Sequence, residues 1–487
     1  MKTHPEIEII QLGDRHLYTL NHPPQIYEDP NRGLQSLLSL PNLISIEINS
    51  LEIIAGKSLK IQSSQLHTLG LYNLDISEAV LVSLVETCKN TLRNLYIPGN
   101  ENVTDSTVFR ILELCGDNLK SLNVSCTKVS CEDLYETLPC LEDLNCSWNE
   151  GLTDEGLLNI FQLCRRTLKT LNVSNTNITG ELLCDFDGSL PNLENVTISA
   201  CKYFTDEGLL MLLWLCGNTL KSLDISITYL RGEFLTEYYG ILPCLENLSL
   251  KFCLFLSDEG LVKFLFKCRK TLNSLDLSKT NITGELIKDL KGALPSLETL
   301  NLSQCENLSE HGLSQLIIKS KHTLRSLDIS RTNITGEAQY GTLHALQSLN
   351  LEGSRLTDTG LLQTIRQCGG TIQSLNISRT NITGGPLWDY DQSLLSIQNL
   401  NCTRTLLTDT GLLQLIWLCG SQLETLDISR TYLSDAVTKQ ILQDYDNVKL
   451  SHKDRVYRPQ LYTMPLNEAN PPLFKIRKQF LGCLKGT

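Results

Sequence analysis

Apolar residues recur along the chain in short phrases in which buried and polar positions alternate. In Leu168–Thr176, Leu220–Thr228 and Leu272–Thr280, leucine, isoleucine or valine occupies the first, fourth and sixth positions. Alternation of this kind over a few residues predicts a short β-strand with one buried face. We count about 16 such phrases from Leu43 to Leu423, and the sequence therefore predicts as many strands.

Every second phrase is followed by a pattern typical of a helix. After the phrase that begins at Leu193, apolar residues recur at helical spacing from Leu209 to Cys216. Thr205 is placed to cap the first turn, and Gly217 stands just past the end, where a left-handed residue commonly stops a helix. We call each phrase with its return segment a rung; the rungs with this helix are the long ones, about 27 residues each.

The short rungs, about 25 residues each, continue with Asn-Ile-Thr-Gly-Glu or a close variant, as at 177–181, and many then reach Leu-Pro. Thr-Gly and Pro leave room only for turns or a short helix. Long and short rungs alternate with a combined period of roughly 50 residues, which is typical of a solenoid. Because one strand and its return segment cannot bury their apolar faces alone, stacking of rungs must form the core.

The pattern Leu-x-x-Leu-x-Leu-x-x-Cys/Thr resembles the leucine-rich repeat. Long rungs, with Cys201 after the strand and Cys216 at the helix end, resemble the cysteine-containing subtype of F-box leucine-rich-repeat proteins. Short rungs resemble plant-type repeats with Thr in place of Asn, and their alternation with long rungs resembles ribonuclease inhibitor. The resemblance implies an α/β solenoid, a curved horseshoe with a parallel β-sheet on the concave face and helices and turns on the convex face.

The chain ends differ from the repeats. We expect residues 1–42 to form an N-terminal cap, in which 6–11 and 16–20 would pair as a small hairpin over the open end of the stack. No F-box pattern is visible there. The solenoid is expected over 43–450, with a degenerate last rung at Val448, and 451–487 would form a C-terminal cap and basic tail.

The 18 cysteines mostly fall at equivalent positions of successive rungs. Alternate rungs are about 10 Å apart, too far for disulfides between equivalent residues. Ser320 stands where other long rungs have cysteine, so no thiol is required there. With no signal-peptide pattern, we expect core thiols in a reducing compartment, the cytoplasm or the nucleus. The helix-end set is Cys88, Cys115, Cys164, Cys216, Cys268, Cys368 and Cys419, and the strand-end set is Cys201, Cys253 and Cys305.

Polar ladders and departures from the repeat mark candidate partner-binding residues on the concave face. The fifth phrase position is Asp or Asn in short rungs, and the eighth is Lys or Arg in later ones. These ladders either neutralise each other in solvent or orient a partner. Aromatic residues in the same area are either interface anchors or pack on neighbouring strands. The candidates are Tyr96, Trp148, Asp224, Phe252, Asp276, Asp328, Arg331, Arg379, Arg404, Asp427 and Arg430.

A second apolar line is expected on the helices. Trp214, Phe266 and Ile318 occupy equivalent positions off the buried stripe. They form either an exposed ridge or a contact with the return segments of short rungs, for instance around Phe234 and Tyr238.

Catalysis is not expected. The eight histidines are scattered, and no His-x-x-x-His or Cys-x-x-Cys pair or phosphate-binding loop is present. Cys126, Cys131, Cys140 and Cys146 lack a repeated ligand spacing, so core thiols explain them better than a metal site. We expect no catalytic residues, no cofactor and no metal.

The sequence therefore predicts a non-catalytic protein-binding module. The net charge of −12 argues against a nucleic-acid partner, which would need a dominant basic surface, and no segment is long enough to span a membrane. The resemblance implies a substrate-recognition or scaffold subunit of a ubiquitin-ligase-type assembly. Two alternatives stay open: a stoichiometric enzyme inhibitor that binds a basic protein, and an extracellular recognition or adhesion protein glycosylated at its Asn-x-Ser/Thr sequons.

Overall fold

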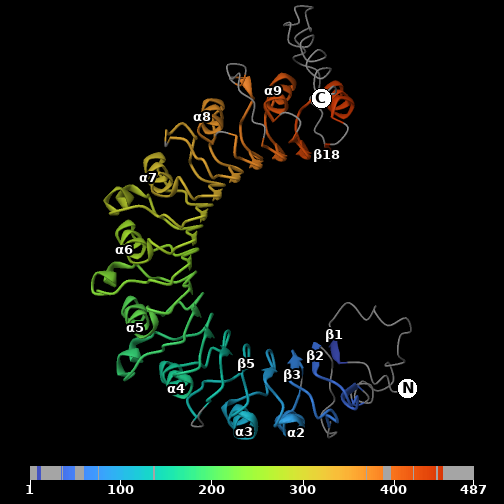
Figure 1. Cartoon of the computed structure of the whole chain (residues 1–487), viewed down its shortest axis with the longest axis vertical. Coiled ribbons are helices and arrows are strands. Elements are labelled where there is room, and N and C mark those ends of the chain that lie inside the picture. Colours follow the sequence, from blue (N-terminus) through green and yellow to red (C-terminus); the bar gives the residue numbers. More distant parts are fainter. Residues whose placement is uncertain are drawn as a thin grey trace, which may run out of the picture.

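The chain forms one curved stack of rungs in a computed structural model, with strands lining the inner side of the arc and helices its outer side (Figure 1). The structure describes residues 8–12, 35, 37–49, 60–74, 76–134, 138–339, 341–368, 370–385, 387, 396–419, 422–445 and 448–452. The predicted curved solenoid with a parallel sheet on the concave face is confirmed.

One sheet of 18 strands runs through the described residues, and each strand pairs in parallel with the next along the chain. Most strands have three residues with a buried centre between two partly exposed neighbours, as in Ser222–Asp224. The strands are β1 (Ile9–Leu12), β2 (Ser45–Asn49), β3 (Thr68–Tyr72), β4 (Asn94–Tyr96), β5 (Ser121–Asn123), β6 (Asp143–Asn145), β7 (Thr170–Asn172), β8 (Asn195–Thr197), β9 (Ser222–Asp224), β10 (Asn247–Ser249), β11 (Ser274–Asp276), β12 (Thr299–Asn301), β13 (Ser326–Asp328), β14 (Ser348–Asn350), β15 (Ser374–Asn376), β16 (Asn399–Asn401), β17 (Thr425–Asp427) and β18 (Lys449–Ser451).

Long rungs return through an α-helix, and three short rungs return through a 3-10 helix. Thr205 caps its helix as predicted, accepting a hydrogen bond from the Gly208 N–H at 3.0 Å. The helices are α2 (Glu78–Cys88), α3 (Asp105–Cys115), α4 (Asp154–Cys164), α5 (Asp206–Cys216), α6 (Asp258–Cys268), α7 (Glu310–Ser320), α8 (Asp358–Cys368), α9 (Asp409–Cys419) and α10 (Asp435–Asp444), with η1 (Glu181–Asp185), η2 (Glu233–Thr236) and η3 (Glu285–Asp289).

The prediction for Gly217 was wrong. This residue is right-handed, with φ −57°, and its N–H donates to the Leu213 carbonyl. Glycine fits there for a steric reason, since a Cβ would lie 2.3 Å from the Tyr238 hydroxyl.

The Thr-Gly pair of four short rungs, as at Thr179-Gly180, is a joint between two long rungs. The side-chain carboxylate of Asp154, the first residue of α4, accepts hydrogen bonds from the N–H groups of Thr179 (2.9 Å) and Gly180 (2.8 Å). On the other side, the Thr205 N–H donates to the Thr179 carbonyl at 2.9 Å. A Cβ on Gly208 would lie only 2.9 Å from the Gly180 Cα. This joint couples two long rungs through the short rung between them.

The cysteines at the repeated helix-end and strand-end positions are part of the core, as predicted, whereas Cys126 is exposed and Cys140 only partly buried, so the core-thiol prediction was wrong for Cys126. The Cys216 thiol donates to the Leu212 carbonyl at 3.2 Å, and Ser320 makes the equivalent bond to Leu316 at 3.0 Å. The Cys201 sulfur lies 3.4 Å from the Thr176 hydroxyl of the preceding rung. Every cysteine in the described part of the chain is unbridged, and burial raises the pKa of the Cys216 thiol to about 12.

The sheet extends past the 16 predicted strands at both ends. β1 pairs in parallel with β2, Ile9 opposite Ser45, whereas the second arm of the predicted hairpin, residues 16–20, lies outside the described residues. β18 forms at the degenerate rung near Val448. The division into 1–42, 43–450 and 451–487 stays a prediction. Within the residues described, the helices are all too short or too polar to cross a membrane.

Candidate functional site

Small polar side chains cover the strands on the concave face. Asp224, Asp276, Asp328 and Asp427 each end a strand there and are partly exposed, and one oxygen of each is already used locally. Asp224 Oδ1 accepts from the Ser226 N–H at 2.9 Å, and the other three make the same bond two residues on, at 2.8 to 2.9 Å. These carboxylates therefore close the turn after the strand, and the second oxygen of Asp328 also accepts from the Asn350 side-chain amide at 2.9 Å.

Two tyrosines break the polar pattern near the N-terminal end. Tyr96, a predicted site residue, is half-buried at the end of β4 and pairs in register with Gly70 of β3. Tyr72, which the sequence analysis missed, donates to Glu47 at 3.4 Å, and burial together with that carboxylate raises its pKa to about 12. Gly70 leaves space for this ring, because a Cβ there would lie 2.7 Å from it. Gly70 inside a strand phrase was the sequence signal that could have pointed to Tyr72, because glycine in a strand often marks a place where another group approaches closely.

The other six predicted residues lie at the eighth phrase position, one turn beyond the strands. Each adopts a left-handed backbone with φ between 53° and 62°. In five of them, from Trp148 to Arg404, the N–H donates across to the next rung, as Phe252 does to the Ser278 carbonyl at 2.7 Å. The side chains thus leave the concave floor and line the edge where strands exit. We call this line the left-handed row: Asn73, Gly99, Cys126, Trp148, Asn175, Ala200, Ile227, Phe252, Lys279, Gln304, Arg331, Gly353, Arg379, Arg404 and Arg430.

The row changes character along the arc. Trp148 is 60% exposed and Phe252 38% exposed, and the Lys279 ammonium lies 5.3 Å from the centroid of the Phe252 ring. Further on, Glu352 bridges Arg331 at 3.4 Å and Arg379 at 3.2 Å. Ion pairing thus joins two of the predicted arginines through a carboxylate that the sequence analysis had not named.

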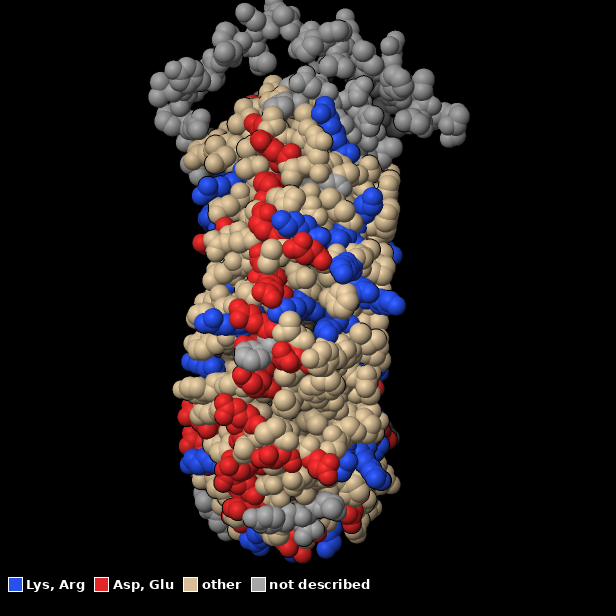
Figure 2. Space-filling model, turned by 90° about the vertical axis from the view of Figure 1, so that its left-hand side faces the viewer, with Lys and Arg blue, Asp and Glu red and all other residues tan. Residues whose placement is uncertain are grey.

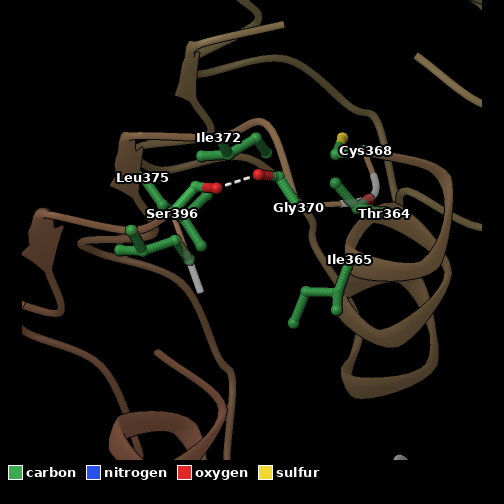
Figure 3. Close-up of a pocket in the computed structure, with 8 residues that line it drawn as sticks. Thr364, Ile365, Cys368, Gly370, Ile372, Leu375 and Ser396 are labelled. Atoms are coloured by element: carbon green, nitrogen blue, oxygen red, sulfur yellow. Dashed lines mark hydrogen bonds between the residues drawn. The ribbon is translucent and has the colours of Figure 1, made fainter. Parts of the chain in front are cut away.

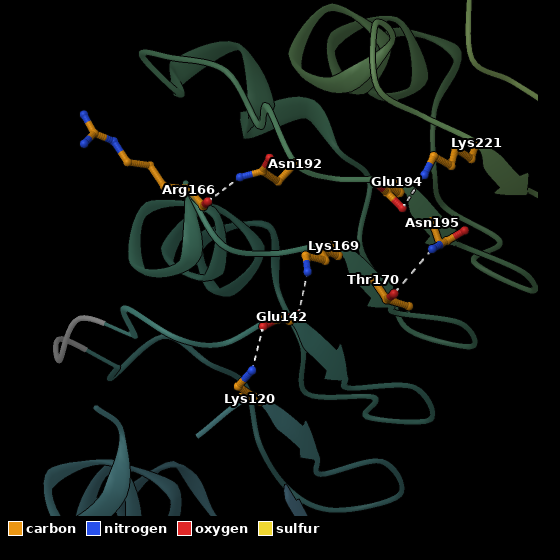
Figure 4. A network of polar contacts seen from close by, with 9 residues as sticks. All are labelled: Lys120, Glu142, Arg166, Lys169, Thr170, Asn192, Glu194, Asn195 and Lys221. Carbon is orange, nitrogen blue, oxygen red and sulfur yellow. Dashed lines mark hydrogen bonds and ion pairs between the residues drawn. The ribbon is translucent and has the colours of Figure 1, made fainter. Parts of the chain in front are cut away.

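At the opposite edge, where strands begin, acidic and basic side chains neutralise each other's charge. Glu142 binds Lys120 at 3.3 Å and Lys169 at 2.6 Å, and Glu194 binds Lys221 at 2.9 Å (Figure 4). The hydrogen bond from Lys169 is the main reason why the pKa of Glu142 is lowered. Positive and negative side chains alternate from rung to rung along this edge, which leaves little net charge for a partner.

The outer face is acidic along its length, with Asp and Glu side chains forming a column in Figure 2. The first turns of the α-helices contribute, for instance Asp206 and Glu207. Of the apolar line on the helices, Trp214 packs edge-on against Tyr238 with ring centroids 5.1 Å apart and is still 50% exposed. Trp214 is thus partly exposed, as a ridge would require, and also contacts the return segment of a short rung, the other alternative. The Phe234 side chain lies outside the described part.

Both enclosed cavities and open hollows occur among the described residues. One between Cys368 and Ile372, next to the contact from Ser396 to the Gly370 carbonyl, has a volume of about 10 Å³ (Figure 3), room for about one water molecule. An open hollow of about 450 Å³ on the strand-entry side is lined by Arg325, His344 and amide or hydroxyl side chains. Among the described residues no three His, Cys, Asp or Glu side chains gather as metal ligands.

Comparison with known proteins agrees with this geometry. A family model described as Leucine Rich repeat matches residues 137–161 and 320–338. DNA repair protein rhp7 of Schizosaccharomyces pombe is 32% identical over 160 residues, 30% of this chain and 27% of that protein. F-box/LRR-repeat protein 4 of Bos taurus is 31% identical over 121 residues, 24% of this chain and 19% of that protein.

The matched part of this chain thus spans less than a third of either relative. A solved structure, the Rad7 and Elc1 complex of yeast, aligns with a TM-score of 0.38 and 18% identity over 65% of this chain and 77% of that one. The parallel sheet and the matched segments show leucine-rich repeats in this chain, and its repeats are similar to parts of the two relatives, one of them an F-box/leucine-rich-repeat protein.

Proposed function

We propose that this protein is a non-catalytic protein-binding module whose partner lies along the concave face and the left-handed row. One observation carries the proposal: bulky side chains such as Trp148 project into solvent from a backbone conformation that non-glycine residues seldom adopt. The hydrogen-bonded rungs hold that backbone in place, so the aromatic groups are preorganised for contact. Exposed aromatic and arginine side chains on a rigid frame are typical of binding hot spots.

The eleven predicted residues have two roles in this proposal. Tyr96, Asp224, Asp276, Asp328 and Asp427 form the polar concave floor, and Trp148, Phe252, Arg331, Arg379, Arg404 and Arg430 form the rim at the strand exit. The similarity to F-box/leucine-rich-repeat proteins supports a substrate-recognition or scaffold subunit of a ubiquitin-ligase-type assembly as the concrete role.

An intracellular location, cytoplasmic or nuclear, goes with this proposal. The buried unbridged thiols favour a reducing compartment. The sequon residues Asn177, Asn281 and Asn333 use their amide nitrogens to donate to backbone carbonyls of the preceding rung at 2.6 to 2.9 Å. Mass spectrometry of the native protein should find these asparagines unmodified; glycans on them would favour the extracellular alternative.

Affinity capture tests the proposal. The full chain, the double variant Trp148→Ala with Arg379→Glu, and the outer-face control Trp214→Ala would be used in parallel, with bound proteins compared by quantitative mass spectrometry. A specific partner should be retained by the wild type and the control and lost by the double variant. Equal recovery by all three proteins would contradict binding at the sheet side.

The inhibitor alternative makes a different prediction. A stoichiometric inhibitor of a basic enzyme would bind through acidic groups, so the charge reversal at Arg379 would leave its complex intact or tighten it. Capture with the single variant Arg379→Glu therefore separates the two functions.

A further inference from the structure

The edge at which strands exit is basic, although the protein as a whole is acidic. From the rung that begins at Leu193 to the one at Leu423, the seventh to eleventh phrase positions contain eight Lys or Arg and two Glu residues. The net charge of the chain is −12. An excess of positive charge thus lies along this edge of the solenoid, between an acidic outer face and a concave floor that carries four aspartates. The ten charged residues are Lys202, Lys251, Lys279, Glu306, Arg331, Glu352, Arg355, Arg379, Arg404 and Arg430.

Only part of this charge is neutralised internally. Glu352 serves both Arg331 and Arg379. Within the part of the chain that the structure describes, the Arg404 and Arg355 side chains are exposed and have no ion-pair partner. Arg379, Arg404 and Arg430 stand at the same position of three consecutive rungs, where neighbouring strands are about 4.8 Å apart. An anionic partner would balance the positive charge that remains on this edge, at Arg404 above all.

An apolar patch lies on the same edge, N-terminal to the arginines. Three consecutive rungs contribute Tyr203, Ile227, Tyr229, Phe252, Leu254 and Phe255, each between 38% and 62% exposed. Tyr229 and Phe255 are in edge-on contact, with centroids 5.3 Å apart. Ile227 is β-branched and left-handed, with φ 59°, a combination that is rare without a functional or structural constraint.

From this arrangement we propose, building on the protein-binding function above, that the strand-exit edge binds an acidic protein segment that carries aromatic or aliphatic side chains. The apolar side chains of the segment pack on the patch around Phe252, and its carboxylates pair with Lys279 and the arginines further along. A nucleic acid fits less well, because its uniform phosphate charge would also lie against Asp224, Asp276 and Asp328 of the adjacent floor.

Peptide selection tests this partner class. A random linear-peptide phage library is panned on the immobilised full chain, and single peptides are then measured by fluorescence anisotropy at low and high salt. Enriched peptides should combine Asp or Glu with aromatic or aliphatic residues and should weaken as salt rises. The variant Arg355→Glu with Arg404→Glu should bind them about tenfold or more weakly. The matched control Lys288→Glu with Lys291→Glu, two exposed lysines of an outer return segment, should bind as the wild type does.

Each other outcome overturns the inference. No enrichment, enrichment of neutral or basic peptides, or unchanged affinity in the arginine variant excludes an acidic segment at this edge. Oligothymidylate that binds more tightly than the peptides and is lost in the arginine variant identifies a nucleic-acid site instead. Failure here is distinct from failure of the proposed function, since capture that depends on Trp148 and Arg379 would still show a protein partner of different chemistry.

Discussion

Alkaline pH should unfold this protein because of its buried thiols. Burial raises the pKa of seven helix-end cysteines from 9.0 to about 12. Between these two values the unfolded chain has lost its thiol protons while the folded chain still holds them. The folded state therefore binds more protons, and the free energy of unfolding falls as the pH rises above 9.

The size of the effect follows from the number of thiols. Each one lowers the free energy of unfolding by roughly 1 kcal/mol per pH unit above 9. Seven equivalent thiols together remove on the order of 10 kcal/mol per pH unit, which is comparable to the whole stability of a typical domain. We therefore expect cooperative loss of structure near about pH 10.

Circular dichroism as a function of pH measures this transition. The control is a variant with Cys216→Ser, Cys268→Ser and Cys368→Ser, because Ser320 shows that a hydroxyl makes the same bond to the carbonyl four residues earlier. Tyrosine and lysine ionisation is common to both proteins, so a higher alkaline midpoint in the variant reports on the thiols. Identical midpoints, or reaction of the helix-end thiols with Ellman's reagent in the native state at the rate of free cysteine, would refute the reasoning.

Three further predictions concern the joint and the rim. Gly260→Ala places a Cβ 2.2 Å from the Arg231 carbonyl oxygen, so its free energy of unfolding, measured by urea denaturation, should be about 2 kcal/mol lower. The control Gly151→Ala, whose Cβ would have nothing within 4 Å, should leave the free energy of unfolding unchanged, and equal effects of the two variants would argue against tight rung contacts. Asp258→Ala removes bonds to Thr283 and Gly284 and should cost about 2 kcal/mol by the same assay. Trp148→Ala should leave the melting temperature unchanged while weakening partner binding; a lower melting temperature would show a structural role.

The strand positions and helix caps were predictable because they depend on local patterns. Leucines at the first and fourth phrase positions indicate a strand with one buried face. Thr205 before Asp206 and Glu207 is a local capping signal. Each of these features depends on residues within one rung.

The left-handed row and the joint were not predictable, because both depend on the neighbouring rung. Trp148, Ile227 and Phe252 are residues that seldom adopt positive φ. Only asparagine or glycine at equivalent positions indicated it, namely Asn73, Gly99, Asn175 and Gly353. Nothing in the sequence links Asp154 to Thr179-Gly180, a pair that indicated only a turn. Their hydrogen bonds across 25 and 26 residues appear only when the rungs are stacked.

Site-specific photo-crosslinking tests most directly whether the partner lies on the sheet side. Benzoylphenylalanine is placed at Ser274 on the concave floor, at Leu254 on the strand-exit edge, or at the exposed Gln162 of α4 on the outer face, and each protein is irradiated with its captured partner. The account predicts crosslinked partner from positions 274 and 254 and none from 162. Crosslinks from position 162 alone would contradict it.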